Sequence, residues 1–238
     1  MAAPRIHIDS LLAAGRSVAL SDNAVRHVQV LRLQPGAPLR LFDGRGGEWC
    51  AEIVSIGRRD VSARAIAHIA IEREAACAVT LALGMPANER MDDLIEKATE
   101  LGVAAIQPLV TERSVLRVDG ERAERKAARW QAIARAACEQ CGRNRVPALA
   151  RPLPLAEWLR AVPAADLRIV LSLDAAAPPL AAPPGLASAL LLSGPEGGLS
   201  PAEMALAVQH GFTPTSLGPR VLRADTAPLA ALARIAVA

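Results

Sequence analysis

Residues 191–201 read LLSGPEGGLSP, and this stretch decides the fold. Its first residues belong to an apolar run typical of a buried strand, which leads straight into a glycine-rich turn. Ser200 and Pro201 then suit the N-cap and the first position of a helix. Strand, glycine turn and helix in this order place backbone N–H groups where open α/β sheets bind small ligands. The stretch therefore predicts an α/β sheet with a ligand site at this turn, and a plain tight turn is the alternative.

The residues of this turn limit what it binds. No Gly-Lys-Ser/Thr follows, and the spacing is not G-x-G-x-x-G, so both common phosphate-binding patterns are missing. A nucleotide- or phosphate-binding enzyme stays open as an alternative function. A second turn lies within residues 215–227, TSLGPRVLRADTA, where Gly218-Pro219 reverses the chain before the last helix. We expect the two turns to converge on one site.

The pattern of apolar residues changes near residue 74. Before it, short alternating stretches predict strands, and after it apolar runs alternate with helical patterns, which predicts a mostly parallel sheet covered by helices. We therefore expect a small β-rich domain over 1–74 and an α/β domain over 75–238. The expected strands of the first are 39–42, 48–54 and 61–71, and an expected βαβ unit of the second comprises 79–83, 92–101 and 104–110.

The composition excludes several classes of protein. Hydrophobic residues make up 52% and charged residues 21%, without an apolar run long enough for a membrane span, so a soluble globular protein is expected. The first residues lack a secretion signal, and the expected location is the cytoplasm. The four cysteines form no disulfide framework, and Cys138 and Cys141 have no partners for a metal site, so we expect no metal. The absence of Tyr argues against sites built on aromatic stacking.

Several segments resemble the RsmE family. The most specific are GPEGGLS at 194–200 and LGPRVLRADTA at 217–227, and KATELGV at 97–103 and CEQCGRN at 138–144 also match. The segments HVQVLR at 27–32 and LFDG at 41–44 are similar to the family's N-terminal domain. Members are SPOUT-class methyltransferases that use S-adenosylmethionine to methylate N3 of one uridine, at position 1498, in 16S ribosomal RNA.

The resemblance spans nearly the whole chain and implies a fold and partners. The expected fold is a SPOUT α/β domain with a mostly parallel sheet and a trefoil knot, preceded by a small PUA-like or OB-like β-barrel that binds RNA. The expected substrate is 16S ribosomal RNA in the assembled 30S subunit, and the expected assembly is a homodimer. A catalytically inactive RNA-binding or ribosome-assembly protein of the same fold is the alternative.

The resemblance also implies site residues. Arg223 is the first candidate for a positive group beside the uracil oxygens and Arg113 is the second, while Glu196 could orient the cofactor or accept a proton. Asp225 stands where the family usually has Glu. The expected S-adenosylmethionine site comprises Leu192, Ser193, Gly194, Pro195, Glu196, Gly197, Gly198, Leu217, Gly218, Pro219, Val221, Leu222 and Arg223. The expected RNA-binding residues are Arg5, Arg26, Arg32, Arg45, Arg143 and Arg145.

Overall fold

The computed structural model describes residues 3–116 and 120–236, without the side chains of Asn88 and Glu89. Two compact units make up the chain. The first unit comprises Met1–Glu74 and Cys138–Val146, and the second comprises Ala75–Ala137 and Pro147–Ala238. The segment Cys138–Val146 thus packs with the first unit, although the sequence places it in the second domain. One cause is that Oε1 of Glu139 accepts a hydrogen bond of 2.8 Å from the backbone N–H of His7.

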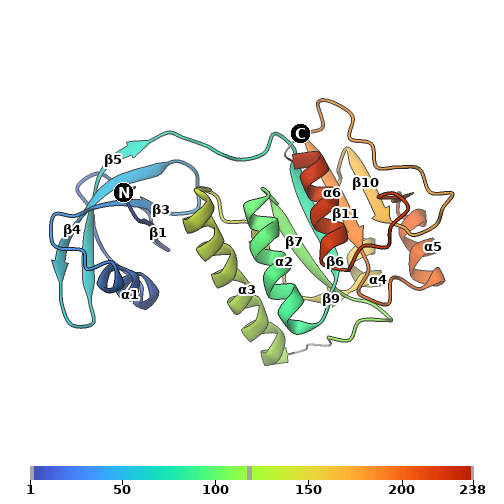
Figure 1. The fold of residues 1–238 in the computed structure, drawn as a ribbon, viewed down its shortest axis with the longest axis horizontal. Coiled ribbons are helices and arrows are strands. Elements are labelled where there is room, and N and C mark those ends of the chain that lie inside the picture. The colour runs from blue at the N-terminus through green and yellow to red at the C-terminus, as the bar shows by residue number, and fades with distance from the viewer. Residues whose placement is uncertain (1–2, 117–119, 237–238) are drawn as a thin grey trace. The chain divides into compact units, whose positions relative to one another are not determined.

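The first unit contains a curled five-stranded sheet (Figure 1). Its first two strands in spatial order are parallel and the remaining pairs are antiparallel. Register shifts in β4, between Cys50 and Ala51 and between Ile53 and Ser55, bend this strand. In spatial order the strands are β1 (Arg5–His7), β3 (Pro38–Phe42), β4 (Glu48–Ile56), β5 (Val61–Ile69) and β2 (Ser17–Ala19).

One helix, α1 (Asp22–Val30), covers the core of the first unit. The side chain of Ser21 caps it by accepting a hydrogen bond from the N–H of Ala24, as the sequence predicts. The helix buries Ala24, Val25 and Val28 against the inner residues of the sheet. This apolar stripe follows the helical period and leaves the opposite face of α1 to solvent.

The second unit contains a parallel sheet, which confirms the predicted α/β class. Its strands in spatial order are β12 (Thr213–Thr215), β10 (Leu167–Leu171), β11 (Ser188–Ser193), β6 (Ala78–Gly84), β7 (Ala105–Val110) and β8 (Ala148–Leu149), and β9 (Leu153–Pro154) also pairs with β7. All described pairs of this sheet are parallel, so the carboxyl ends of β10, β11 and β12 lie at one edge.

Helices cover both faces of this sheet (Figure 1). Helices α2 (Asn88–Glu100) and α6 (Thr226–Ala236) pack together, and α6 contacts β6 and β11. On the other face, α4 (Leu155–Arg160) and α5 (Pro201–Gln209) form a core with the alternate strand residues Leu190 and Leu192 and with Phe212, which precedes β12. The remaining helix is α3 (Gly120–Cys141), whose Trp130 is fully buried.

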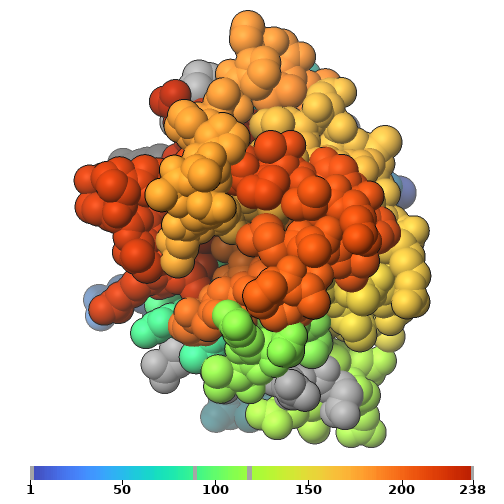
Figure 2. Space-filling model, turned by 90° about the vertical axis from the view of Figure 1, so that its right-hand side faces the viewer, coloured from blue at the N-terminus to red at the C-terminus, as the bar shows by residue number. Residues whose placement is uncertain are grey.

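The last segment of the chain crosses the carboxyl edge of the sheet. After β12, Ser216 donates its N–H to the carbonyl of Pro178 (2.8 Å) and accepts at its own carbonyl from Leu180 (3.0 Å). These bonds join the segment to the connection between β10 and β11. The chain then returns to α6 over β6 and β11. Figure 2 views this side of the second unit, where orange and red segments surround a hollow.

Candidate functional site

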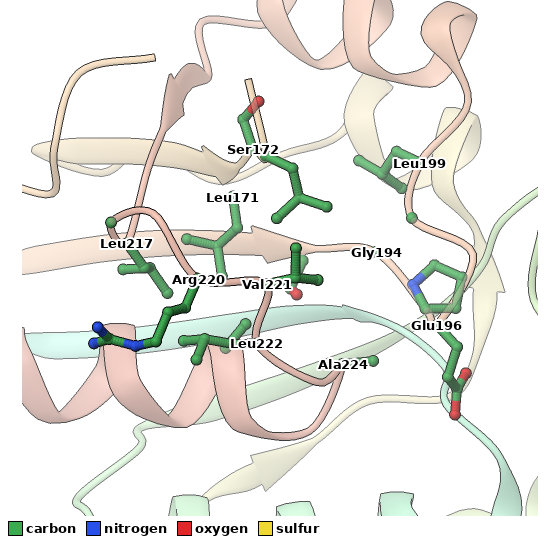
Figure 3. A pocket seen from close by; sticks show the side chains of 16 residues that line it. Leu171, Ser172, Gly194, Glu196, Leu199, Leu217, Arg220, Val221, Leu222 and Ala224 are labelled. Carbon is green, nitrogen blue, oxygen red and sulfur yellow. The ribbon is translucent and has the colours of Figure 1, made fainter. Parts of the chain in front are cut away.

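A pocket lies at the carboxyl edge of the parallel sheet in the second unit. Three segments form it, and each begins at the end of one strand: β10, β11 or β12 (Figure 3). This is the place where open α/β sheets bind ligands. The lining residues are Leu171, Ser172, Leu173, Ser193, Gly194, Pro195, Glu196, Gly198, Leu199, Leu217, Gly218, Arg220, Val221, Leu222, Ala224 and Ala227. We call residues 193–199 the first loop and residues 216–225 the second loop.

The first loop folds back on itself so closely that it requires glycine. A Cβ atom on Gly194 would lie 2.8 Å from the backbone carbon of Gly198 and from the backbone nitrogen of Leu199. A Cβ atom on Gly84, at the end of β6, would lie 2.8 Å from the backbone nitrogen of Pro195. These atoms belong to the backbone and cannot turn aside as a flexible side chain would. The two glycines therefore set how tightly the first loop packs on the sheet.

Side chains from neighbouring elements hold the first loop in place. Nη1 of Arg113, in the turn after β7, donates to the carbonyl of Gly197 at 2.8 Å. Oε1 of Glu196 accepts from the backbone N–H of Ala87 at 3.1 Å and from Nη1 of Arg90 at 3.2 Å. Two of the three expected catalytic residues thus fasten the loop to the rest of the second unit.

The helix after the first loop, α5, is capped at its N-terminus. Ser200 and Glu203 form a capping box, and Pro201 occupies the first turn of α5, so the predicted cap is confirmed. Oε1 of Glu203 also accepts from the backbone N–H of Glu112 at 2.8 Å. The start of α5 is thereby tied to the same turn that carries Arg113. The first loop is consequently held at both of its ends.

The second loop has few internal contacts. No backbone N–H of residues 220–224 donates a hydrogen bond to another residue that the structure describes. Arg220, Val221 and Arg223 are exposed, and Val221 keeps 77% of its accessible surface. Oδ1 of Asp225 is buried and has no hydrogen-bond partner within the described chain. The second loop therefore offers unpaired backbone and side-chain groups beside the pocket.

The pocket walls are mostly apolar. Leu171 and Val221 lie near the centre of the view in Figure 3, and Leu217 lies to their left. Glu196 and Arg220 lie at opposite sides of this view and supply charge at the margins. The lining contains no aromatic residue. A ligand here would contact aliphatic side chains and the backbone, as expected of small-molecule sites with a few polar groups.

Most residues of the expected cofactor site line this pocket, and four do not. Leu192 is fully buried in the core beneath the first loop, because its side chain points to the α4 and α5 face. Gly197, Pro219 and Arg223 stand next to lining residues without lining the pocket themselves. The expected residues that do line it are Ser193, Gly194, Pro195, Glu196, Gly198, Leu217, Gly218, Val221 and Leu222.

The third wall of the pocket was not predicted from the sequence. Leu171, Ser172 and Leu173 come from the end of β10 and the residues just after it. The carboxyl end of β10 reaches the same sheet edge as the strand before the first loop, because the two strands are parallel. The segment has no glycine turn, so nothing local marked it. Leu199, Arg220, Ala224 and Ala227 complete the missed residues.

Two of the six expected RNA-binding arginines form ion pairs within the first unit, where Arg5 is partly buried and Arg143 is buried. Arg5 forms an ion pair with Glu48 and donates to the side-chain oxygen of Asn144 at 2.8 Å. The side chain of Arg143 is 5% exposed and pairs with Glu74. Burial acts to raise the pKa of Glu48, but Arg5 and Arg73 outweigh it and lower the pKa. The guanidinium groups of both arginines are thus engaged with side chains of their own unit.

The other four expected RNA-binding arginines lie at the surface. Arg26, Arg32, Arg45 and Arg145 are all exposed. Arg145 pairs with Glu72 at 3.3 Å.

The thiol of Cys138, in the segment Cys138–Val146, is buried, and burial raises its pKa to about 12, as expected of a structural thiol. Among the described residues, no group of three His, Cys, Asp or Glu could hold a metal ion, and no helix is both long and apolar enough to cross a membrane.

Comparisons with known proteins agree with this architecture. An RNA methyltransferase domain family matches residues 73–236, and an RNA methyltransferase PUA domain family matches residues 20–66. Ribosomal RNA small subunit methyltransferase E of Synechocystis sp. is 35% identical over 225 residues, covering 92% of this chain and 72% of the relative. The Bacillus subtilis protein of the same name is 32% identical, covering 91% and 88%.

Solved structures are similar over almost the whole chain. A methyltransferase from Legionella pneumophila in complex with S-adenosylmethionine has a TM-score of 0.91 at 37% identity, covering 98% of this chain and 97% of that one. Ribosomal RNA small subunit methyltransferase E from Neisseria gonorrhoeae, bound to S-adenosylmethionine, has a TM-score of 0.90 at 35% identity, covering 98% and 96%. The predicted fold class, a SPOUT domain after a PUA-like β-domain, is thereby confirmed. The chain belongs to the RsmE family of RNA methyltransferases.

Proposed function

We propose that this protein transfers a methyl group from S-adenosylmethionine to N3 of one uridine in 16S ribosomal RNA, at position 1498 by family resemblance. The proposed substrate is the assembled 30S subunit in the cytoplasm. The observation that carries the proposal is the pocket between the carboxyl ends of β10, β11 and β12 in a member of the RsmE family. Two similar structures, from Legionella pneumophila and Neisseria gonorrhoeae, are described as bound to S-adenosylmethionine.

The residues of the pocket fit this cofactor. The unpaired N–H groups of residues 220–224 can pair with the polar edge of an adenine, and the aliphatic walls suit its faces. The buried, unpartnered Oδ1 of Asp225 can accept a hydrogen bond from a ligand hydroxyl or amine. When bound, S-adenosylmethionine supplies an electrophilic methyl group on a sulfonium. The protein's task is then to align the uracil N3 with that methyl group.

Uracil N3 carries a weakly acidic proton, which must leave as the new N–CH₃ bond forms. The protein must therefore favour the state in which negative charge spreads to the uracil oxygens. We assign this role to Arg223, because it is exposed, lacks a partner among the described residues and follows the lining residue Leu222. Arg113 is the second candidate, and its guanidinium keeps further N–H groups beyond the one given to Gly197.

Glu196 has a different role in this proposal. Its Oε1 already accepts hydrogen bonds from the backbone N–H of Ala87 and from Arg90, so this oxygen is engaged with the rest of the second unit. We therefore assign Glu196 to positioning the first loop and not to removing the N3 proton.

Leu173 and Val221 are highly exposed at the pocket, with 75% and 77% of their accessible surface exposed. We propose that a second copy of the chain covers these two side chains in a homodimer.

The decisive experiment follows the position of the methyl group. Methylation of N3 removes the Watson–Crick donor of uracil, so reverse transcriptase stops at the modified base, whereas methylation of C5 or of the 2′-hydroxyl leaves pairing intact. Subunits from a strain lacking the protein should gain one stop on incubation with the protein and S-adenosylmethionine. Mass spectrometry of the digested RNA should identify 3-methyluridine. Methylation at another atom would contradict the proposal.

The same assay defines the substrate and tests the open alternative. We expect methylation of isolated 30S subunits and little methylation of free 16S ribosomal RNA. Calorimetry should detect binding of S-adenosylmethionine and not of ATP, because the first loop lacks the phosphate-binding pattern. Binding of ATP in the absence of methyl transfer would favour the nucleotide-binding alternative instead.

A further inference from the structure

The helix of the first unit ends in an unusual way. Leu31, the C-cap residue of helix α1, has αR backbone, and Arg32 then takes φ = +52°. The N–H of Arg32 donates to the carbonyl of Gln29 at 3.0 Å, and the N–H of Leu33 donates to that of Val28 at 3.1 Å. These two bonds define a Schellman motif, whose left-handed position is usually glycine. Arginine occupies it here.

The arginine at this position is not explained by the stability of the fold. Among the described residues, Arg32 is the one non-glycine residue with a positive φ. Glycine would adopt this backbone without steric cost, whereas a Cβ atom crowds the neighbouring carbonyl. The guanidinium of Arg32 is exposed and pairs with no residue that the structure describes. A residue with left-handed backbone whose guanidinium has no hydrogen-bond or ion-pair partner among the described residues is a candidate for contact with a partner molecule.

Two further arginines lie beside this helix end. Arg58 and Arg59 form the tip of the hairpin between β4 and β5, where Gly57 N–H donates to the carbonyl of Asp60. Nε2 of Gln29 donates to the carbonyl of Arg58 at 3.3 Å, so the tip contacts the last turn of α1 (Figure 1). Both arginines are exposed, and their guanidinium groups form no hydrogen bond or ion pair within the described residues.

The charge of this surface is positive. Arg26 lies one turn before Gln29 on α1 and is also exposed, with a hydrogen bond to Asn23. The facing acidic groups are Asp60 on the tip and Asp22 at the distant start of α1. Arg26, Arg32, Arg58 and Arg59 therefore outnumber the carboxylates. Guanidinium groups suit phosphate groups, because each can donate two N–H groups to one phosphate.

We propose that Arg32, Arg58 and Arg59 bind the phosphate backbone of the RNA substrate, and that the left-handed backbone at Arg32 is retained for this contact. The inference rests on the proposed function for the identity of the RNA. It predicts that the stability of the fold and the affinity for RNA respond in opposite directions to the same substitution at Arg32.

The first experiment separates these two responses. Arg32→Gly and Arg32→Asn remove the charge and favour the left-handed backbone, so the unfolding temperature should stay the same or rise. Binding to unmethylated 30S subunits should weaken about fivefold at 0.15 M salt for each lost phosphate contact, and the slope of log K against log salt should fall by about 0.7–0.9. Arg32→Lys, which keeps the charge, should restore most of the affinity.

The second experiment uses the hairpin tip, where no backbone strain is involved. The triple variant Arg32→Asn, Arg58→Gln, Arg59→Gln should bind unmethylated 30S subunits about 100-fold more weakly at 0.15 M salt. Its slope of log K against log salt should fall by about 2 or more. Arg160→Gln, which removes one exposed charge from the last turn of α4, is the matched control and should leave affinity and slope unchanged.

Several outcomes would overturn the proposal. Wild-type affinity and slope in the triple variant would exclude the contact, and so would a lower unfolding temperature in Arg32→Gly, which would show that Arg32 stabilises the fold. If the triple variant lost binding to vesicles of phosphatidylglycerol as strongly as it lost binding to 30S subunits, this surface would contact a membrane instead. The binding assay does not need methyl transfer, so a protein that binds subunits but leaves uridine N3 unmodified would refute the proposed function alone.

Discussion

The two loops that line the pocket differ in how they are held. The first loop has hydrogen bonds from Arg113 to Gly197 and from Ala87 and Arg90 to Glu196, and a capping box follows it. The N–H groups of residues 220–224 in the second loop have no partner among the described residues. A loop with its own partners keeps its shape without a ligand, whereas a loop without them gains partners when the ligand arrives. We therefore regard the first loop as a fixed wall and the second as the wall that the ligand orders.

Arg223→Ala tests the chemistry assigned to the second loop, and we expect the largest effect here. Loss of a group that stabilises charge in the transition state costs about 10²- to 10³-fold in rate. Single-turnover methyl transfer should fall by this amount, while calorimetry should find an affinity for S-adenosylmethionine within severalfold of wild type. Arg223→Lys should recover part of the rate. An unchanged single-turnover rate would remove Arg223 from the mechanism.

Hydrogen exchange tests the contrast between the loops directly. The amides of residues 220–224 should exchange quickly in the free protein and slow by about 100-fold when S-adenosylmethionine is present at about 100 times its Kd. The amide of Gly198, which donates to Pro195 at 2.8 Å, should already be slow. Equal protection of both loops in the free protein would refute the distinction between a fixed and a ligand-ordered wall.

Gly194→Ala tests the rigidity of the first loop. The added Cβ atom would lie 2.8 Å from backbone atoms, and the resulting strain of roughly 1–3 kcal/mol should weaken S-adenosylmethionine binding about tenfold. Gly185→Ala is the control, since Gly185 has φ = +81° but open space around it. That variant should lower stability by about 1 kcal/mol and leave the affinity unchanged. Wild-type affinity in Gly194→Ala would show that the first loop adapts.

Glu196→Gln should have the smallest effect. The substitution removes the ion pair with Arg90, which is 40% exposed, and keeps an oxygen for the N–H of Ala87. Exposed ion pairs contribute at most about 1 kcal/mol of stabilisation, so losing this pair should lower the methyl-transfer rate only severalfold. The pH dependence of the rate should keep its shape. A loss as large as that of Arg223→Ala would show that Glu196 takes part in proton removal.

The local features of the fold could be predicted well from the sequence. The cap at Ser200, the cap at Ser21 and the strand before Gly194 each depend on residues a few positions apart. Such features follow from backbone chemistry and from the period of apolar residues. The expected convergence of the two glycine turns also holds, because parallel strands place their carboxyl ends at one edge.

The features that could not be predicted depend on contacts between distant residues. Arg5 and Arg143 were grouped with exposed arginines, since charge in a sequence does not reveal whether a carboxylate 43 or 69 residues away is its partner. The wall at Leu171–Leu173 was missed because it has no glycine turn of its own. The positive φ at Arg32 is equally hidden, because helix-ending residues are recognised in sequence by glycine.

The sequence by itself determined the class of the fold, the two glycine turns and the family, since these rest on residue types and short spacings. The tertiary structure decided which charges are buried, which loop is held and which arginines remain available to a partner. The physical reason is that burial and pairing depend on the surroundings of a side chain in space. Those surroundings are built from strands and helices that lie far apart along the chain.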